Sequence, residues 1–146
     1  MVRNSSPNKS EKLKKILKFL SYRARSEKEI RDRLAKYGLT SQEIDIEVDR
    51  LKKWKLIDDN EFAQLYAESR ARSQPRSNWL INLELKRKGV KPGEETLSDL
   101  ELAKLALGKK KNLKSREQAV HFLQSRGFSW ETIVKVLQDR YNDPNG

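Results

Sequence analysis

The sequence predicts an all-α protein made of tandem three-helix repeats, similar to helix-turn-helix modules, in an elongated, curved arrangement. Apolar residues recur three and four positions apart through most of its 146 residues, which is the spacing of one helix face. Only 6 glycines and 4 prolines interrupt the chain. A pattern of helix cap, apolar residue and glycine also occurs three times, and repeats that contact mainly their neighbours favour an extended row.

The first three-helix repeat is predicted over residues 11–58. Ser26 can cap a helix, and Glu29 three residues later completes a capping box. Gly38 is placed to end that helix in the left-handed conformation. The three expected helices are Lys12–Tyr22, Ser26–Tyr37 and a third that starts at Thr40 or Ser41 and ends near Trp54.

A tight joint is predicted at residues 56–59, where the first repeat ends and a new helix begins. Asp58 can accept a hydrogen bond from an unpaired backbone N–H, and Glu61 can reach back to complete a capping box. Aspartates here also face the positive end of the helix dipole. Phe62 and Tyr66 then fall on one helix face, so this stretch is predicted to be architectural.

The cap, the apolar residue and the glycine of the first repeat recur in register, at shifts of 51 and 89 residues. Three matches at fixed offsets indicate a triplicated unit. The matched sets are Ser26, Leu34, Gly38, Leu39; Ser77, Leu85, Gly89, Val90; and Ser115, Leu123, Gly127, Phe128.

The second repeat is predicted over residues 59–100 and the third over 101–141, with a shortened junction between them. Pro92 and Gly93 break the chain, and a third helix of the second repeat is expected near Glu94–Leu107. The unequal spacing suggests that this helix has merged with, or replaced, the first helix of the third repeat. Residues 1–10 and 142–146 are expected to be mobile tails.

Composition limits the classes of partner and compartment. The 32 Lys and Arg exceed the 21 Asp and Glu, for a net charge of +11, which favours an anionic partner. There is no cysteine and no apolar run of transmembrane length, so a soluble, cytoplasmic protein, expected to be monomeric, is predicted.

No residue pattern indicates catalysis, a cofactor or a metal. His121 is the only histidine and has no cysteine to share an ion with. Asp58, Asp59 and Glu61 could be a carboxylate cluster, but helix capping explains them without an ion. Glycine-rich phosphate loops and two-histidine motifs are also missing. A protein that is not an enzyme is predicted.

Clustered basic residues are the candidates for contact with a partner or with DNA, because such clusters bind phosphate or an acidic groove. Scattered lysines such as Lys12, Lys14 and Lys52 are expected only to solvate helix surfaces. Trp79 and Trp130 could stack on bases, although packing in the core is favoured for the aromatic residues. The candidate contact residues are Arg70, Arg72, Arg76, Lys86, Arg87, Lys88, Lys109, Lys110, Lys111 and Lys114.

The stretch LIDDNEFAQLYAESRAR at residues 56–72, preceded by SEKEIRDRLAKYGL at 26–39, resembles the RecX family of regulators of the RecA recombinase. The resemblance runs from about Leu13 to Leu137. Family members usually have more chain between the second and third repeats. The residues that match the family motif are Asp58, Asp59, Phe62, Ala63 and Arg70, all expected to be architectural apart from Arg70.

The resemblance implies a protein that binds the RecA nucleoprotein filament in its helical groove and inhibits ATP hydrolysis and strand exchange. It also implies a place in DNA repair, homologous recombination and the SOS response. An independent, basic nucleic-acid-binding protein of the helix-turn-helix kind is the alternative, since the net charge fits it. Weak, sequence-indifferent DNA binding is compatible with both functions.

Overall fold

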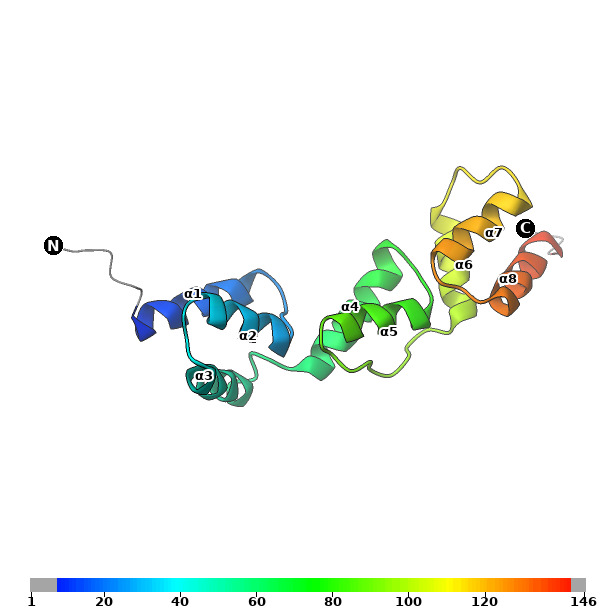
Figure 1. The fold of residues 1–146 in the computed structure, drawn as a ribbon. Coiled ribbons are helices and arrows are strands. Elements are labelled where there is room, and N and C mark those ends of the chain that lie inside the picture. Colours follow the sequence, from blue (N-terminus) through cyan, green and yellow to red (C-terminus); the bar gives the residue numbers. More distant parts are fainter. Residues whose placement is uncertain (1–7, 143–146) are drawn as a thin grey trace. The chain divides into compact units, whose positions relative to one another are not determined.

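The computed structural model describes residues 8–142, which form eight α-helices and no β-strand (Figure 1). The predicted all-α class is therefore confirmed. The helices are α1 (Lys9–Tyr22), α2 (Glu27–Lys36), α3 (Ser41–Lys53), α4 (Asp59–Ser73), α5 (Asn78–Arg87), α6 (Asp99–Lys109), α7 (Arg116–Ser125) and α8 (Trp130–Asn142).

The described residues divide into two compact units. One contains residues 8–62 with 88–91, and the other contains 63–87 with 92–142. The division falls inside α4, whose first four residues belong to the first unit. The predicted repeat boundaries at 11–58, 59–100 and 101–141 stay a prediction about sequence units, and so does the predicted elongated, curved arrangement.

In the first unit, α1, α2 and α3 enclose an apolar core. Ile16, Leu34 and Leu51 are fully buried there, and Ile57 closes the core just before α4. Burying a side chain of this size stabilises the fold by roughly 1.5–3 kcal/mol. The predicted capping box of Ser26 and Glu29 is present. The core therefore follows from the apolar spacing of the three amphipathic helices.

The repeated pattern has the same local structure at each of its three occurrences. Each glycine has a positive φ, of 89°, 75° and 83° at Gly38, Gly89 and Gly127. The leucine four residues before each glycine is buried. The prediction of a repeated cap, buried leucine and terminating glycine is thus confirmed residue by residue.

The junction after α5 contains no helix. Residues 88–98 are turns and extended chain, and α6 begins at Asp99 rather than near Glu94. Ser98 supplies the side chain that caps α6. The helix α6 packs on α7 and α8, so these three helices form one group. The interpretation of α6 as a merged or replaced helix of the repeats stays a prediction.

The ends of the chain differ slightly from the expected tails. α1 begins at Lys9, capped by Asn8, so the last two residues of the expected tail 1–10 are helical. α8 extends to Asn142. Residues 1–7 and 143–146 lie outside the described part of the chain.

The two aspartates at the start of α4 have different hydrogen-bond partners. Asp58 accepts from the backbone N–H groups of Asn60 and Glu61, at 3.0 and 3.2 Å, and so caps its own helix as predicted. Asp59 accepts from the backbone N–H of Glu27, at 2.9 Å, and so satisfies the first turn of α2. The hydrogen bond between Glu27 and Asp59 joins residues that are 32 positions apart, so it is a tertiary contact.

The second unit contains the same contact. The Asp99 carboxylate, at the start of α6, accepts from the backbone N–H of Asn78 at the start of α5, at 2.9 Å. The Asn78 side chain also donates to Asp99 and to the Leu97 carbonyl oxygen, each at 2.9 Å. In both units, an aspartate in the first turn of a later helix thus satisfies the N-terminus of an earlier helix, where the helix dipole favours a negative charge.

Candidate functional site

The predicted cluster Arg70, Arg72 and Arg76 is organised around a carboxylate. Arg76 Nη1 lies 2.5 Å from Glu84 Oε2, and the Tyr66 hydroxyl donates to Glu84 Oε1 at 2.7 Å. Arg70 Nε lies 4.0 Å from the same oxygen, with its guanidinium 5.0 Å from the Tyr66 ring centre. Burial, and then the hydrogen bond to Glu84, raise the pKa of Tyr66.

These contacts distinguish the three candidate arginines from one another. The Arg76 side chain is only 13% exposed, and its charge is balanced by Glu84. Arg70 is half-buried beside the same carboxylate, whereas Arg72 is exposed. The reason is tertiary, because Glu84 comes from α5 while the arginines come from α4 and the turn after it. Arg72 is therefore the member of the cluster that is best placed for a partner.

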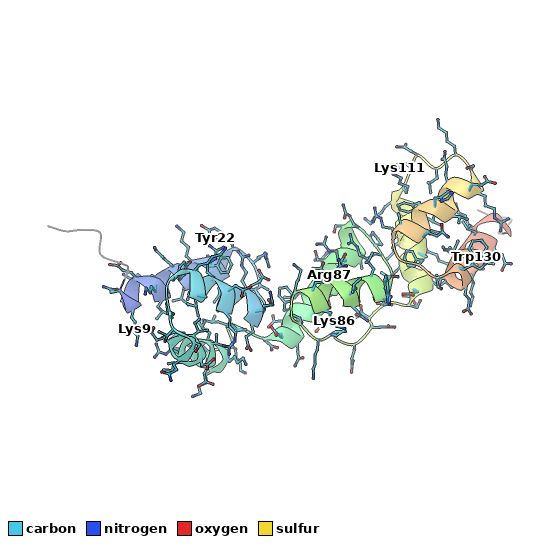
Figure 2. All side chains as sticks on the ribbon, viewed as in Figure 1. Lys9, Tyr22, Lys86, Arg87, Lys111 and Trp130 are labelled. Atoms are coloured by element: carbon cyan, nitrogen blue, oxygen red, sulfur yellow. The ribbon has the colours of Figure 1, made fainter. Side chains whose placement is uncertain are left out.

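The second predicted cluster lies at the end of α5. Lys86 and Arg87 are exposed in its last turn, and both are labelled in Figure 2. Lys88 is half-buried in the turn that follows. Positive charge at a helix C-terminus also stabilises the helix dipole, so these residues suit both a structural and a binding role.

The third group of predicted residues lies at the end of α6, which holds Lys109, and in the loop between α6 and α7. Lys109, Lys110, Lys111 and Lys114 are all exposed, and Lys111 projects outward from this loop in Figure 2. The Lys110 ammonium lies 5.7 Å from the centre of the Phe122 ring. This contact directs Lys110 toward α7.

An open hollow of about 230 Å³ lies in the second unit beside this loop. The Arg126 guanidinium lies 5.0 Å from the Phe122 ring centre, and Arg126 Nη1 donates to the Pro75 carbonyl oxygen at 3.4 Å. The structure thus brings two predicted lysines together with an arginine that sequence reasoning missed. The hollow is lined by Ser73, Gln74, Pro75, Ala106, Lys109, Lys110, Phe122 and Arg126.

Arg126 carries an uncompensated charge. Burial, and then repulsion from Arg76, lower its pKa. No local sequence signal marks it, because it is one basic residue in an ordinary turn after α7. Arg126 becomes important only because a segment distant in sequence approaches it: the Ser77 backbone N–H donates to the Arg126 carbonyl oxygen at 3.0 Å.

Several basic residues of the first unit form ion pairs with carboxylates. Glu27 contacts Lys52 at 2.5 Å and Arg31 at 2.8 Å, and these hydrogen bonds lower its pKa. Glu29 contacts Arg23 at 2.7 Å and Arg25 at 3.6 Å. The sequence analysis expects Lys52 only to solvate a helix surface, but the structure shows that it also forms an ion pair with Glu27.

The tryptophans are more exposed than predicted. Trp79 is 65% exposed and Trp130 62%, so the expectation of core packing is wrong for both. Each lies in the first turn of a helix on the side away from the core, a position that apolar spacing alone does not resolve. Phe62 and Phe128, by contrast, are buried as predicted.

Residues 8–142 contain neither a candidate metal site nor a candidate membrane span. No group of three His, Asp or Glu in this part of the chain could hold a metal ion, and His121 is exposed. None of the helices described has the length and apolar character needed to cross a bilayer.

Comparison with protein-family models gives two consecutive matches. Residues 13–51 match the model "RecX, first three-helix domain", and residues 58–93 match "RecX, second three-helix domain". The boundary between the matches coincides with the joint before α4. The first match spans α1 to α3, and the second spans α4, α5 and the extended chain after them.

Curated relatives of similar sequence are regulatory proteins named RecX. That of Bacillus pumilus is 34% identical over 139 residues, covering 85% of this chain and 53% of the relative. That of Chlorobaculum tepidum is 33% identical over 141 residues, covering 89% and 88%. The chain thus spans about half the length of the Bacillus relatives and most of the Chlorobaculum one.

Two solved structures share the fold. The crystal structure of RecX from Lactobacillus salivarius has a TM-score of 0.67 at 20% identity, covering 89% of this chain and 94% of that one. A second structure, of regulatory protein RecX, has a TM-score of 0.65 at 21% identity, covering 94% and 81%.

Proposed function

This chain belongs to the RecX family, and we propose that it regulates the RecA recombinase by binding the RecA nucleoprotein filament in its helical groove. The bound protein would inhibit ATP hydrolysis and strand exchange, and so act in DNA repair and recombination. The pair of consecutive three-helix domain matches is the observation that carries this proposal.

The distribution of charge supports a partner that is anionic over an extended surface. The exposed basic residues come from the end of α4, the end of α5 and the loop after α6. A groove that contains DNA phosphates or acidic side chains can meet several such positions at once. No catalytic group is needed, because a protein lying in the groove acts by occupying it.

The direct test is the ATPase activity of RecA on single-stranded DNA, measured with increasing amounts of this protein. We expect the activity to fall in a dose-dependent way. If ATP hydrolysis and strand exchange are both unchanged at saturating protein, the proposed regulation is wrong.

A charge-neutral variant tests the contact surface. Replacing Arg72, Lys86 and Arg87 by glutamine should raise the half-inhibitory concentration by about tenfold, which corresponds to about 1.4 kcal/mol of binding. The matched control neutralises Lys12, Lys14 and Lys18 of α1, which also removes three charges. Equal loss in both variants would indicate that net charge, and not this surface, governs binding.

The alternative is an independent nucleic-acid-binding protein, which the net charge of +11 favours. Titration of DNA binding against salt, with several unrelated sequences and without RecA, separates the two functions. Weak binding that is indifferent to sequence agrees with a filament regulator. Strong preference for one duplex sequence would favour the alternative.

A further inference from the structure

The hollow beside the α6–α7 loop is positively charged and has no internal counter-charge. Lys109, Lys110 and Arg126 line it. Within the described part of the chain, no carboxylate forms an ion pair with any of these three side chains. This differs from Arg76 nearby, which forms an ion pair with Glu84.

Arg126 is held in this position by contacts that do not neutralise it. One is the face of Phe122, and the other is the Pro75 carbonyl oxygen at 3.4 Å. A half-buried guanidinium next to a second arginine is unfavourable, as the lowered pKa of Arg126 reflects. An anion in the hollow would relieve both the desolvation and the repulsion.

We propose that this hollow binds a backbone phosphate of single-stranded nucleic acid. The guanidinium fork of Arg126 matches phosphate oxygens, and the ammonium groups of Lys109 and Lys110, which also line the hollow, add positive charge. Lys110 and Arg126 already occupy positions over the Phe122 ring, so the hollow receives a phosphate rather than a stacked base.

A single strand fits better than a duplex, because a flexible backbone can lower one phosphate into a recess. The neighbouring phosphates would then follow the loop, where Lys111 and Lys114 are exposed. Lys111 is labelled in Figure 2. The contact goes beyond the proposed regulation of RecA, since it is a property of this chain and needs no filament.

The test is binding of dye-labelled oligothymidylate without RecA, followed by fluorescence anisotropy at several salt concentrations. The double variant Arg126→Gln, Lys110→Gln should bind about tenfold more weakly at low salt. Because both side chains contact the same phosphate, the slope of log K against log salt should fall by about 0.7, the value for one phosphate contact of a single strand.

Three further variants isolate the site. Lys14→Gln with Lys18→Gln removes two exposed charges from α1 and should leave both affinity and slope nearly unchanged. Arg126→Lys keeps the charge but loses the fork, and should give a smaller loss than Arg126→Gln. Lys109→Gln with Lys110→Gln repeats the test without touching Arg126, in case its replacement perturbs the fold.

Two outcomes would overturn the proposal. Equal losses in the α1 control and the hollow variants would mean that only net charge matters. Displacement of the oligonucleotide by poly-glutamate at lower concentration than by unlabelled oligothymidylate would mean that the hollow takes a carboxylate of a protein partner. Neither outcome alters the RecA ATPase assay, so failure of this site and failure of the proposed function remain distinguishable.

Discussion

Two arginine sites in the second unit differ in one respect, the presence of a carboxylate. Around Glu84, the charges of Arg70 and Arg76 converge on one acidic group that also accepts from Tyr66. Around the hollow, Arg126 has an aromatic face and a carbonyl oxygen but no acidic partner. Arg76 thus has a carboxylate partner within the chain, although the buried Arg70 Nε, 4.0 Å from Glu84, makes no hydrogen bond. Arg126, in contrast, has no carboxylate partner in the described part of the chain.

The comparison shows that a basic residue becomes a candidate contact only after its internal partners are taken into account. By sequence, Arg76 belonged to a promising cluster and Arg126 to none. The structure reverses this ranking. Arg76 forms an ion pair with Glu84 of α5, whereas Arg126 lines the open hollow. Net charge alone would not distinguish them.

Removing the carboxylate is the strongest way to break this contrast. Glu84→Gln should lower the free energy of unfolding by about 2–3 kcal/mol, because it leaves Arg76 half-buried without a counter-ion. Urea denaturation followed by circular dichroism measures the change. Glu95→Gln, at an exposed loop position, is the control and should have almost no effect.

The aspartate contact between helix starts is the next largest test. Asp59→Ala should cost about 1 kcal/mol, since the Glu27 N–H loses its acceptor at the positive end of α2. Asp99→Ala should cost a similar amount or slightly more, because it also frees the Asn78 amide. Unchanged urea midpoints in both variants would show that water replaces these carboxylates at no cost.

Acid titration probes the paired charges of the first unit. The pKa of Glu27 is lowered below 4.5 by its hydrogen bonds to Lys52 and Arg31, so its stabilising contribution is complete above pH 4.5. That contribution is lost as the pH falls through the folded-state pKa. The free energy of unfolding should therefore be lower at pH 3.5 than at pH 7.

Lys52→Gln removes the leading cause of that shift, so it should lower stability at pH 7 and reduce the further loss on acidification. Lys53→Gln is the matched control, because its partner Asp49 is on the open surface. A pH dependence that is identical in the two variants would contradict the role assigned to Glu27.

The smallest expected effect belongs to Arg126. Arg126→Gln should change the free energy of unfolding by less than about 0.5 kcal/mol, because the lost ring contact is offset by relief of repulsion from Arg76. Urea denaturation at low salt is the measurement. A loss comparable to that of Glu84→Gln would show that Arg126 is structural, and would weaken the contrast from which the phosphate site was inferred.

Much of the local structure could be predicted from the sequence, because it depends on residues three to five positions apart. The capping box of Ser26 and Glu29, the cap at Asp58 and the glycine-terminated helices are of this kind. The start of α6 was placed too early, since the leucines of that region suggested a longer helix. The Ser98 cap marks the actual start.

The candidate site could be predicted only in part, because pairing between distant side chains is not a local property. Lys109 and Lys110 were identified from their clustering. The neutralisation of Arg76 by Glu84 and the approach of Arg126 to Pro75 join segments 8 and 51 residues apart. The exposure of Trp79 was missed for the same reason, since helix spacing does not say which neighbours are present.

The close approach at Gly127 has a consequence for the rate of folding. A Cβ there would lie 2.7 Å from Ser77 Oγ and 3.0 Å from Leu80 Cβ, so the turn after α7 fits directly against the start of α5. Closing that contact requires a loop of 50 residues, whereas α2 and α3 in the first unit meet through a short turn. Because contacts distant in sequence slow the crossing of the folding barrier, the group of α1, α2 and α3 should pack before the contact at Gly127 closes. During synthesis, the N-terminal helices would then pack first, and Ser77 and Leu80 would gain their contact with Gly127 only after the turn following α7 has been synthesised.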